Sequence, residues 1–255
     1  MKRLYNNDDI SFMGKLKESF INKKWIFSFL ILYLGILSSP VLGDTYTVVN
    51  TNDSGIGSLR QAIINANTNP GADVISFNIP GDGPHIIKPS SGFPGVTGQV
   101  FINGYSQSGS TPATANSSAV ISIGIDWGAA FSSNVIIFAP GSDGSQLSGI
   151  SMYGAQDDTM VKVYGNTTTL VANVKISGNY FGIDPMGNVI GFYIAIQTQY
   201  AGNIQIGGPN PEDRNVISGG ISAAIRLSPS VAGSEPISTG TLIQGNYIGT
   251  DISGL

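Results

Sequence analysis

Acidic side chains are the first candidates for chemistry in this sequence of 255 residues, which has no cysteine and a single histidine, His85. Asp157 and Asp158 form the only adjacent pair of aspartates after residue 43, and Lys162 follows four residues later. Cleavage of a polysaccharide needs paired carboxylates, or carboxylates together with a basic group that removes a proton. Adjacent residues of a strand face opposite ways, so an extended segment would send only one aspartate into a cleft. In a loop both are solvated, and this interpretation is favoured over a catalytic one.

Trp127 and Asp126 are the candidates for binding a sugar without cleaving it. The ring offers an apolar face, and the neighbouring carboxylate can accept a hydrogen bond from a hydroxyl group. The alternative is that Trp127 packs inside the fold, which is the more common fate of a large aromatic side chain.

The residues that the sequence lacks restrict the chemistry further. Without cysteine the chain has no disulfide, no thiolate metal site and no cysteine nucleophile. One histidine leaves no histidine-rich metal cluster and at most one imidazole base. We therefore expect neither a metal nor another cofactor.

Charge is distributed unevenly along the chain. Residues 1–43 contain six basic and three acidic side chains, which leaves 12 − 6 = 6 basic and 16 − 3 = 13 acidic groups in the remainder. A body with a net charge of −7 repels phosphates, so the sequence argues against nucleic-acid binding. A polysaccharide or a cell surface is the expected partner.

The N-terminal segment has the pattern of a secretory signal peptide. Lys23 and Lys24 precede thirteen mostly apolar residues, 25–37, and small residues lead to a cleavage site after Gly43. This apolar run is shorter than the roughly 20 residues of a membrane-spanning helix. We expect residues 1–43 to be removed on export, with translation starting at Met1 or Met13, and no membrane span in 44–255. Uncleaved anchoring is the alternative.

A nine-residue pattern occurs twice, at 176–184 and at 243–251, with six identical positions and a spacing of 67 residues (243 − 176). Looser copies lie at 147–150 and at 215–220, where Ile217 is aligned with Ile176. Such self-similarity indicates a solenoid, in which each unit buries its apolar face against its neighbours. The interval would then hold three turns of roughly 22 residues.

The positions repeated in this pattern are interpreted as structural. Strand alternation points Ile176 and Ile243 inward, and Gly178 and Gly245 allow a turn without a Cβ. The asparagines are expected to stack at a corner about 4.8 Å apart, the tyrosines to form a second column, and the aspartates to close turns. These repeated residues are Asn179, Tyr180, Asp184, Asn246, Tyr247 and Asp251.

One helix is expected in the body of the protein. Ser58 and Gln61 match a capping box, and Leu59, Ala62, Ile63 and Ala66 follow at helical spacing. A dozen short strands separated by glycine and asparagine come after it, with no further helical pattern. Because the pattern repeats, the fold class predicted is all-β, a right-handed parallel β-helix over 44–255, with a cap at about 44–80 whose helix spans 58–66.

Two segments, 53–63 and 69–80, resemble the N-terminal region of secreted bacterial parallel β-helix proteins of the pectin-lyase-like type. That region often contains Cys-Ser-Leu-Arg-Glu-Ala; here Gly57 stands for the Cys and Gln61 for the Glu. The repeats at 178–184, 206–208, 214–219 and 245–251 resemble the coils of the same proteins. The resemblance implies the fold, but such scaffolds include adhesin-like surface proteins as well as enzymes.

The function expected is a secreted or cell-surface scaffold that is non-catalytic and adhesin-like or carbohydrate-binding. A polysaccharide lyase or glycoside hydrolase is the alternative, and its site would lie where the repeat is broken, chiefly at 153–170. Because the chain stops at Leu255, early in a repeat, we also expect further sequence beyond it.

Overall fold

The computed structural model describes residues 42–128, 135–228 and 239–255, which belong to one compact unit, Leu42–Leu255. Residues 1–41 of the predicted signal peptide lie outside the described part. Within that part, the chain is mostly β-strand with one α-helix, and no helix is long and apolar enough to cross a membrane.

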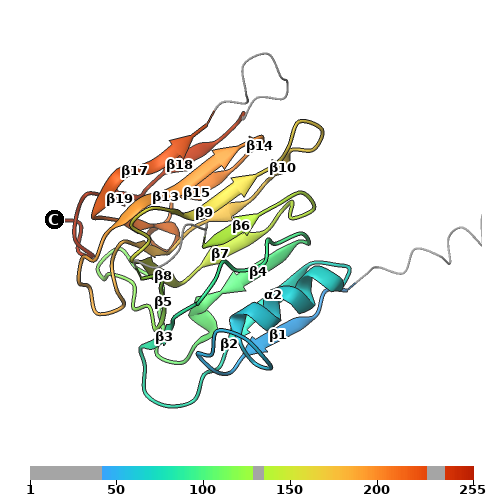
Figure 1. Ribbon diagram of the computed structural model, residues 1–255. Coiled ribbons are helices and arrows are strands. Elements are labelled where there is room, and N and C mark those ends of the chain that lie inside the picture. The colour runs from blue at the N-terminus through green and yellow to red at the C-terminus, as the bar shows by residue number, and fades with distance from the viewer. Residues whose placement is uncertain (1–41, 129–134, 229–238) are drawn as a thin grey trace, which may run out of the picture. The chain divides into compact units, whose positions relative to one another are not determined.

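The strands form parallel sheets, and neighbouring strands in each sheet come from distant parts of the sequence (Figure 1). Sheet A contains, in spatial order, β1 (Thr45–Val48), β2 (Asp73–Phe77), β4 (Val100–Asn103), β7 (Gln146–Ser148), β11 (Lys175–Ile176), β15 (Gln205–Gly207) and β18 (Leu242–Gln244). Sheet B contains β3 (His85–Ile87), β5 (Ile123–Asp126), β8 (Ile150–Tyr153), β12 (Tyr180–Phe181), β16 (Val216–Ile217) and β19 (Tyr247–Ile248). Sheet C contains β6 (Ile136–Phe138), β9 (Thr159–Tyr164), β13 (Phe192–Gln199) and β17 (Gly220–Leu227). The small sheet D pairs β10 (Val171–Ala172) with β14 (Ala201–Gly202).

The chain visits these sheets in a fixed order. From β7 in sheet A it continues through β8 in sheet B, β9 in sheet C and β10 in sheet D, and it re-enters sheet A at β11. We call each such passage a circuit. Parallel strands that follow each other within one sheet need a long crossover. Only β1 and β2 follow each other within sheet A in the described part of the chain, and helix α2 makes that crossover. From β2 onward consecutive strands belong to different sheets, so short connections suffice and no α-helix intervenes there.

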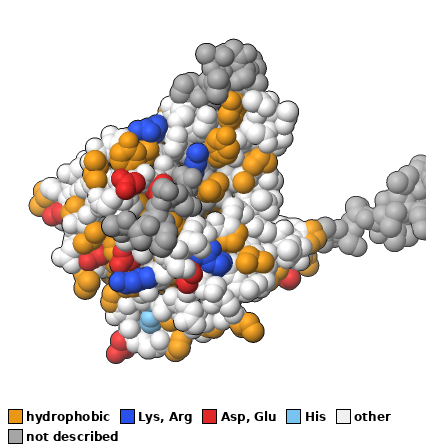
Figure 2. Space-filling view, viewed as in Figure 1, with side chains coloured by type: hydrophobic (Ala, Val, Ile, Leu, Met, Phe, Trp, Pro, Cys, Tyr) orange, Lys and Arg blue, Asp and Glu red, His pale blue; other side chains and the backbone are white. Residues whose placement is uncertain are grey.

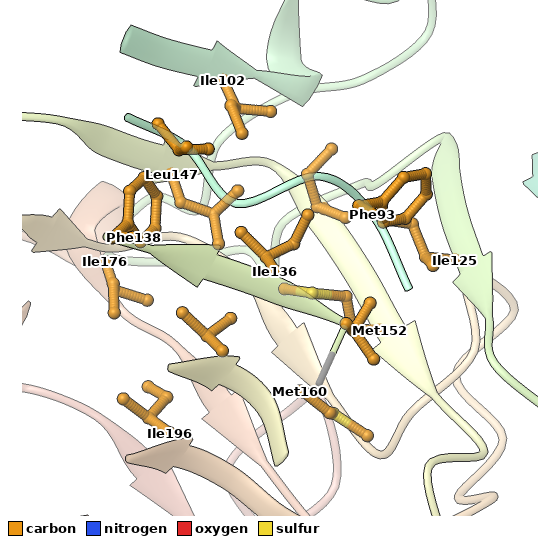
Figure 3. Close-up of a cluster of buried hydrophobic side chains, with 14 of the residues drawn as sticks. Phe93, Ile102, Ile125, Ile136, Phe138, Leu147, Met152, Met160, Ile176 and Ile196 are labelled. Carbon is orange, nitrogen blue, oxygen red and sulfur yellow. The ribbon is translucent and has the colours of Figure 1, made fainter. Parts of the chain in front are cut away.

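Equivalent residues of successive circuits pair in register. Leu147 pairs with Ile176, and Ile176 with Ile206, with all three side chains at most 1% exposed. Figure 3 shows Leu147 and Ile176 in a common interior with Ile136 of sheet C and Met152 of sheet B. The predicted inward orientation is confirmed for Ile176. Its counterpart Ile243 is 43% exposed, because β18 is the last strand of sheet A.

The register corrects two expectations. Ile217 pairs with Phe181 in sheet B, whereas the partner of Ile176 is Ile206, so the alignment of Ile217 with Ile176 was wrong. The 67 residues from Ile176 to Ile243 contain two circuits rather than three, of 30 (206 − 176) and 37 (243 − 206) residues. The reason is that each circuit includes the long loops and strands of sheet C, which the repeated pattern does not mark.

A ladder of asparagines occupies the corner between sheets A and B. The Nδ2 of Asn179 donates to Oδ1 of Asn215 (3.1 Å), and the Nδ2 of Asn215 donates to Oδ1 of Asn246 (2.9 Å). Asn179 and Asn215 are fully buried. The predicted stacking of asparagines is confirmed, with Asn215 as a rung that the alignment had missed. Gly178 and Gly245 precede two of the rungs with φ of 69° and 68°, as a tight corner requires.

The α-helix α2 (Leu59–Thr68) covers the core at the β1 end of sheet A (Figure 1). The Ser58 side chain accepts a hydrogen bond from the backbone N–H of Gln61, and Leu59, Ala62, Ile63 and Ala66 are buried, as predicted. The Gln61 side chain donates to Asn65 instead of returning to Ser58, so the capping box is half formed. Two short 3₁₀ turns, η1 (Gly104–Ser106) and η2 (Pro211–Asp213), lie in loops.

Arg60 ties this cap to the loop before β4. Its guanidinium forms an ion pair with Asp53 (2.6 Å) and donates to the carbonyl groups of Gly92 and Ser91. Burial alone would raise the pKa of Asp53, but hydrogen bonds from Ser90 and Arg60 outweigh it and hold this pKa below its ordinary value. The arginine of the Ser-Leu-Arg-Gln segment is therefore a structural clamp.

Substitution of the middle asparagine tests how much the ladder contributes to the free energy of unfolding. Asn215→Ala removes the acceptor of Asn179 and the donor to Asn246, and we expect it to lower the free energy of unfolding by about 2–4 kcal/mol, because buried amides lose their partners. Urea denaturation measures the loss. Asn116→Ala, in an exposed loop, is the control and should stay within about 0.5 kcal/mol. Equal small effects of both changes would refute the ladder's importance.

The ion pair of Asp53 with Arg60 should account for part of the loss of protein stability at acidic pH. A carboxyl group with a lowered folded-state pKa stabilises the protein above its unfolded pKa of about 3.9, and this contribution is lost as pH falls through the folded pKa. Asp53→Asn should therefore reduce stability near neutral pH and flatten its decline below about pH 4. Urea midpoints measured across this range give the comparison, and an unchanged pH profile would contradict it.

Candidate functional site

Asp157, Asp158 and Lys162 do not meet in one cleft. The aspartates lie in a bend between β8 and β9, where Asp157 is exposed and Asp158 is half-buried. Lys162 lies on β9, and its Nζ is 4.4 Å from the centre of the Tyr164 ring. Burial lowers the pKa of Lys162. The structure thus places both aspartates in a bend, as the loop interpretation expected, and Asp157 is the one whose side chain is exposed to solvent.

Trp127 belongs to the interior. It is 2% exposed, and its ring centre lies 6.3 Å from that of Phe93. The packing alternative considered for this residue is the one found, so its ring offers no face to a sugar. Strand alternation explains its position directly after the outward-facing Asp126, because Ile123, Ile125 and Trp127 all face the core.

Asp126 is held in local contacts. Its carboxylate forms an ion pair with Lys88 (3.0 Å) and accepts a hydrogen bond from the backbone N–H of Gly128 (3.2 Å). It pairs in register with Tyr153, and burial, followed by the charges of Asp126 and Asp184, raises the pKa of Tyr153 to about 12. Asp126 lies at the surface while Trp127 lies in the core, so the two side chains do not form the sugar-binding pair that the sequence suggested.

The repeated tyrosines cover sheet B from outside. Tyr180 is 2% exposed and donates its hydroxyl hydrogen to the carbonyl oxygen of Ala119 (2.6 Å), while Tyr247 lies beneath the guanidinium of Arg214 (4.1 Å). Val216 pairs with both tyrosines and separates them, so the expected continuous tyrosine column is wrong. The reason is that the intervening circuit has a valine at this position.

The repeated aspartates organise turns, as expected. Asp184 accepts hydrogen bonds from the backbone N–H groups of Met186 and Asn188, each at 2.9 Å, and is 5% exposed. Asp251 accepts from Ser253 and Leu255 in the same manner, and these hydrogen bonds hold its pKa below the ordinary value. Neither carboxylate is available as a partner for Asp157 or Lys162.

Sheet C presents a polar row that sequence reasoning missed. Lys162, Gln197 and Arg226 pair across β9, β13 and β17, with Ile137 of β6 at the end of the row. All three polar side chains are partly exposed. Gln197 accepts from the Thr159 hydroxyl (3.2 Å) and donates to Ser228 (2.8 Å), so its amide is fixed. Tyr164, 38% exposed, adds an aromatic face beside Lys162.

A break in strand alternation orients this row. Along each strand of sheet C, just before the residue of the polar row or its equivalent Ile137, two adjacent residues both join or contact the buried core, and the next residue points outward. These inward pairs are Val135–Ile136, Met160–Val161, Ala195–Ile196 and Ala224–Ile225. A local departure from regular pleating is the usual cause of such a pair. The sequence signal was an apolar pair followed by a long polar residue at 162, 197 and 226.

The surface seen in Figure 2 carries basic and acidic side chains in small, mixed groups among uncharged ones. On this face they form no continuous basic patch of the kind that neutralises nucleic-acid phosphates. Among the residues with described positions, no group of three or more His, Cys, Asp or Glu side chains is arranged to hold a metal ion. The candidate site is therefore the polar row on sheet C, which offers hydrogen-bond donors, two cations and the aromatic ring of Tyr164.

Comparison with protein-family models and with curated proteins finds no match to this chain.

Two substitutions test whether Asp184 stabilises its turn while Asp157 is only a solvated side chain. Asp184→Ala removes an acceptor that three N–H groups of its turn share, and we expect it to reduce the free energy of unfolding by about 1–3 kcal/mol. Asp157→Ala, in the exposed bend, should change it by less than about 0.5 kcal/mol. Thermal and urea unfolding of both variants decide the matter. A larger loss at Asp157 would reverse the two roles.

Proposed function

We propose that this protein is a secreted or cell-surface scaffold, a right-handed parallel β-helix, that binds polysaccharide on the outer face of sheet C without cleaving it. The observation that carries the proposal is the row of Lys162, Gln197 and Arg226 beside Tyr164.

The β-helix rests on the circuits. Sheets A, B and C are each built from successive passages of the chain, in parallel and in register, which is the organisation of a solenoid. The helix α2 closes one end of its core, as a terminal cap must. Right-handed connections are the rule where parallel strands are joined in this way.

Export is supported by the N-terminal sequence. Basic residues, a thirteen-residue apolar run and small residues before Gly43 have the order of a cleaved signal peptide. The absence of cysteine is compatible with an oxidising compartment, because no thiol is left to pair wrongly.

A carbohydrate fits the polar row for geometric reasons. The three side chains stand on adjacent strands about 4.8 Å apart, so they form a linear set of contacts suited to a repeating polymer. The amide of Gln197 can exchange hydrogen bonds with hydroxyl groups, and Lys162 and Arg226 can bind carboxylates or other acidic groups. The two cations also favour an acidic polysaccharide in a body whose net charge is negative.

A binding role is preferred over catalysis because of what the acidic groups do. Asp126 is engaged by Lys88, and Asp184 by its own turn, while Asp157 lies in an exposed bend. A general acid or base must lie within hydrogen-bond reach of the group that it serves. The lysine of the row is positioned by Tyr164 instead.

The test is a panel of acidic and neutral polysaccharides in affinity electrophoresis and calorimetry. We expect an acidic polymer to bind, and Lys162→Ala together with Arg226→Ala to weaken its affinity at least tenfold. Lys88→Ala removes one exposed cation just after β3 and is matched in charge to each single variant, Lys162→Ala or Arg226→Ala; its affinity should be unchanged while each single variant binds more weakly. Equal losses in all variants would indicate non-specific charge attraction and overturn the site.

The same samples examine the enzymatic alternative. New reducing ends or unsaturated uronate absorbance that vanish in Asp157→Ala or Asp158→Ala would overturn the non-catalytic proposal. N-terminal sequencing of the protein exported by a bacterial host checks the export, with Asp44 as the expected first residue.

A further inference from the structure

Asp73 is a buried carboxylate with an incomplete set of partners. It is 1% exposed and begins β2, directly beneath the start of β1. Its Oδ1 accepts hydrogen bonds from the side chain of Asn69 (2.8 Å) and from the backbone N–H of Asp44 (2.7 Å). Its Oδ2 is buried and has no hydrogen-bond partner in the described part of the chain. Buried polar atoms nearly always have partners, so this vacancy calls for a physical reason.

The charge of Asp73 is also uncompensated. The ion pairs found among the described residues join Arg60 to Asp53, Lys88 to Asp126 and Lys175 to Asp213, and none involves Asp73. Burying a carboxylate without a cation is costly, whereas a cation in contact offsets much of that cost. A cation within reach of both carboxylate oxygens would give Oδ2 a hydrogen-bond partner and would balance the negative charge.

The backbone nitrogen of Asp44 is the atom placed to become that cation. It already lies 2.7 Å from Oδ1 of Asp73, and the sequence predicts cleavage of the bond just before it. In that hydrolysis, water adds to the Gly43 carbonyl carbon, the C–N bond breaks, and Gly43 leaves as a carboxylate. The nitrogen of Asp44 takes up protons and becomes an α-ammonium group with three N–H donors.

We propose that Asp73 is the binding site for the α-ammonium group that cleavage after Gly43 creates at Asp44. The inference rests on the proposed export of the chain. One donor keeps the existing bond to Oδ1, and another can serve Oδ2, because the two oxygens share one carbon atom. The ion pair fastens β1 to β2 next to the C-terminal end of α2, so maturation locks the cap that covers the core.

The site is specific for the position of the cut. A Cβ atom placed on Gly43 would lie 1.8 Å from the carbonyl oxygen of Ala72, so the chain is pressed against the start of β2 at this point. A terminus at Gly43 would move the ammonium by one residue, about 3.8 Å along the chain, and away from Asp73. Only the cut before Asp44 places the charge correctly.

The pH dependence follows from the ion pair. A free α-amino group has a pKa of about 7.7–8.0, and pairing with Asp73 raises it in the folded state. Its contribution to stability is complete below the unfolded value and is lost as pH rises through the folded one. The other titratable groups near it are the Asp44 carboxyl group and Tyr46. Burial, followed by the charges of Asp73 and Asp44, raises the pKa of Tyr46 above its ordinary value, which moves its titration further from that of the amine.

The experiment measures one full-length protein before and after the cut. Residues 37–42 are replaced by a protease recognition sequence that ends in Gly43, so that cleavage in vitro leaves Asp44 first. At pH about 6 we expect the cut to lower the unfolding equilibrium constant at least tenfold, and this gain to disappear by about pH 10. A second protein cut before Gly43 carries the same charge one residue away and should show no gain. Equal gains in the two proteins would overturn the proposal.

Variants separate the two carboxylates beside the amine. Asp73→Asn should abolish the gain on cutting, while Asp44→Asn, which alters only an exposed side chain, should retain it. If Asp73→Asn prevents folding, the wild-type protein still provides a readout. Labelling of its α-amine with an acid anhydride should reach half its maximal rate at least one pH unit higher than in urea-unfolded protein. An identical midpoint in both states would refute the ion pair.

Because the cut is made in vitro, these results do not depend on bacterial export or on polysaccharide binding. Failure of the export or binding experiments would therefore be seen separately from failure of the Asp73 site.

Discussion

The in-register stacking of one circuit on the next is the constraint on which the other features depend. Leu147, Ile176 and Ile206 show it in the core, where an aliphatic side chain at one level covers its equivalent at the next. A shift by one residue would expose these side chains, because strand side chains alternate. The asparagine ladder adds a polar register at the corner, since the amides of Asn179 and Asn215 each donate to the equivalent amide one level away as well as to backbone carbonyl groups. Core and corner thus enforce the same alignment.

This alignment also determines where binding groups can lie. The residues that repeat in the pattern have structural roles. Asn179 belongs to the ladder, Asp184 stabilises a turn, and Tyr180 donates a hydrogen bond to Ala119 in the loop before β5. Residues on the outer faces of the sheets do not stabilise corners or turns, but the stacking of circuits still spaces them regularly. The row of Lys162, Gln197 and Arg226 is therefore a product of the same register, directed outward.

The first circuit differs from the others, because β1 is the end strand of sheet A among the described residues and no described circuit stacks on its far side. Helix α2 covers the core there, Arg60 attaches it to the neighbouring loop, and β1 is joined to β2. The buried Asp73 lies where helix end, first strand and second strand meet. Under the proposed cut before Asp44, the new ammonium group would bind this carboxylate, and closure of this end of the core would then depend on the charge at that position.

The sequence by itself determined the strand-rich class, the helix with its buried face and Ser58 cap, the corner asparagines and the turn aspartates, because these depend on local periodicity and turn chemistry. Only the tertiary structure decided the register, the rung at Asn215, the burial of Trp127 and the row on sheet C. Those features arise between residues about 30–40 positions apart, such as Lys162 and Gln197. Loops of unequal length separate these partners, so no fixed spacing in the sequence records which residues become neighbours.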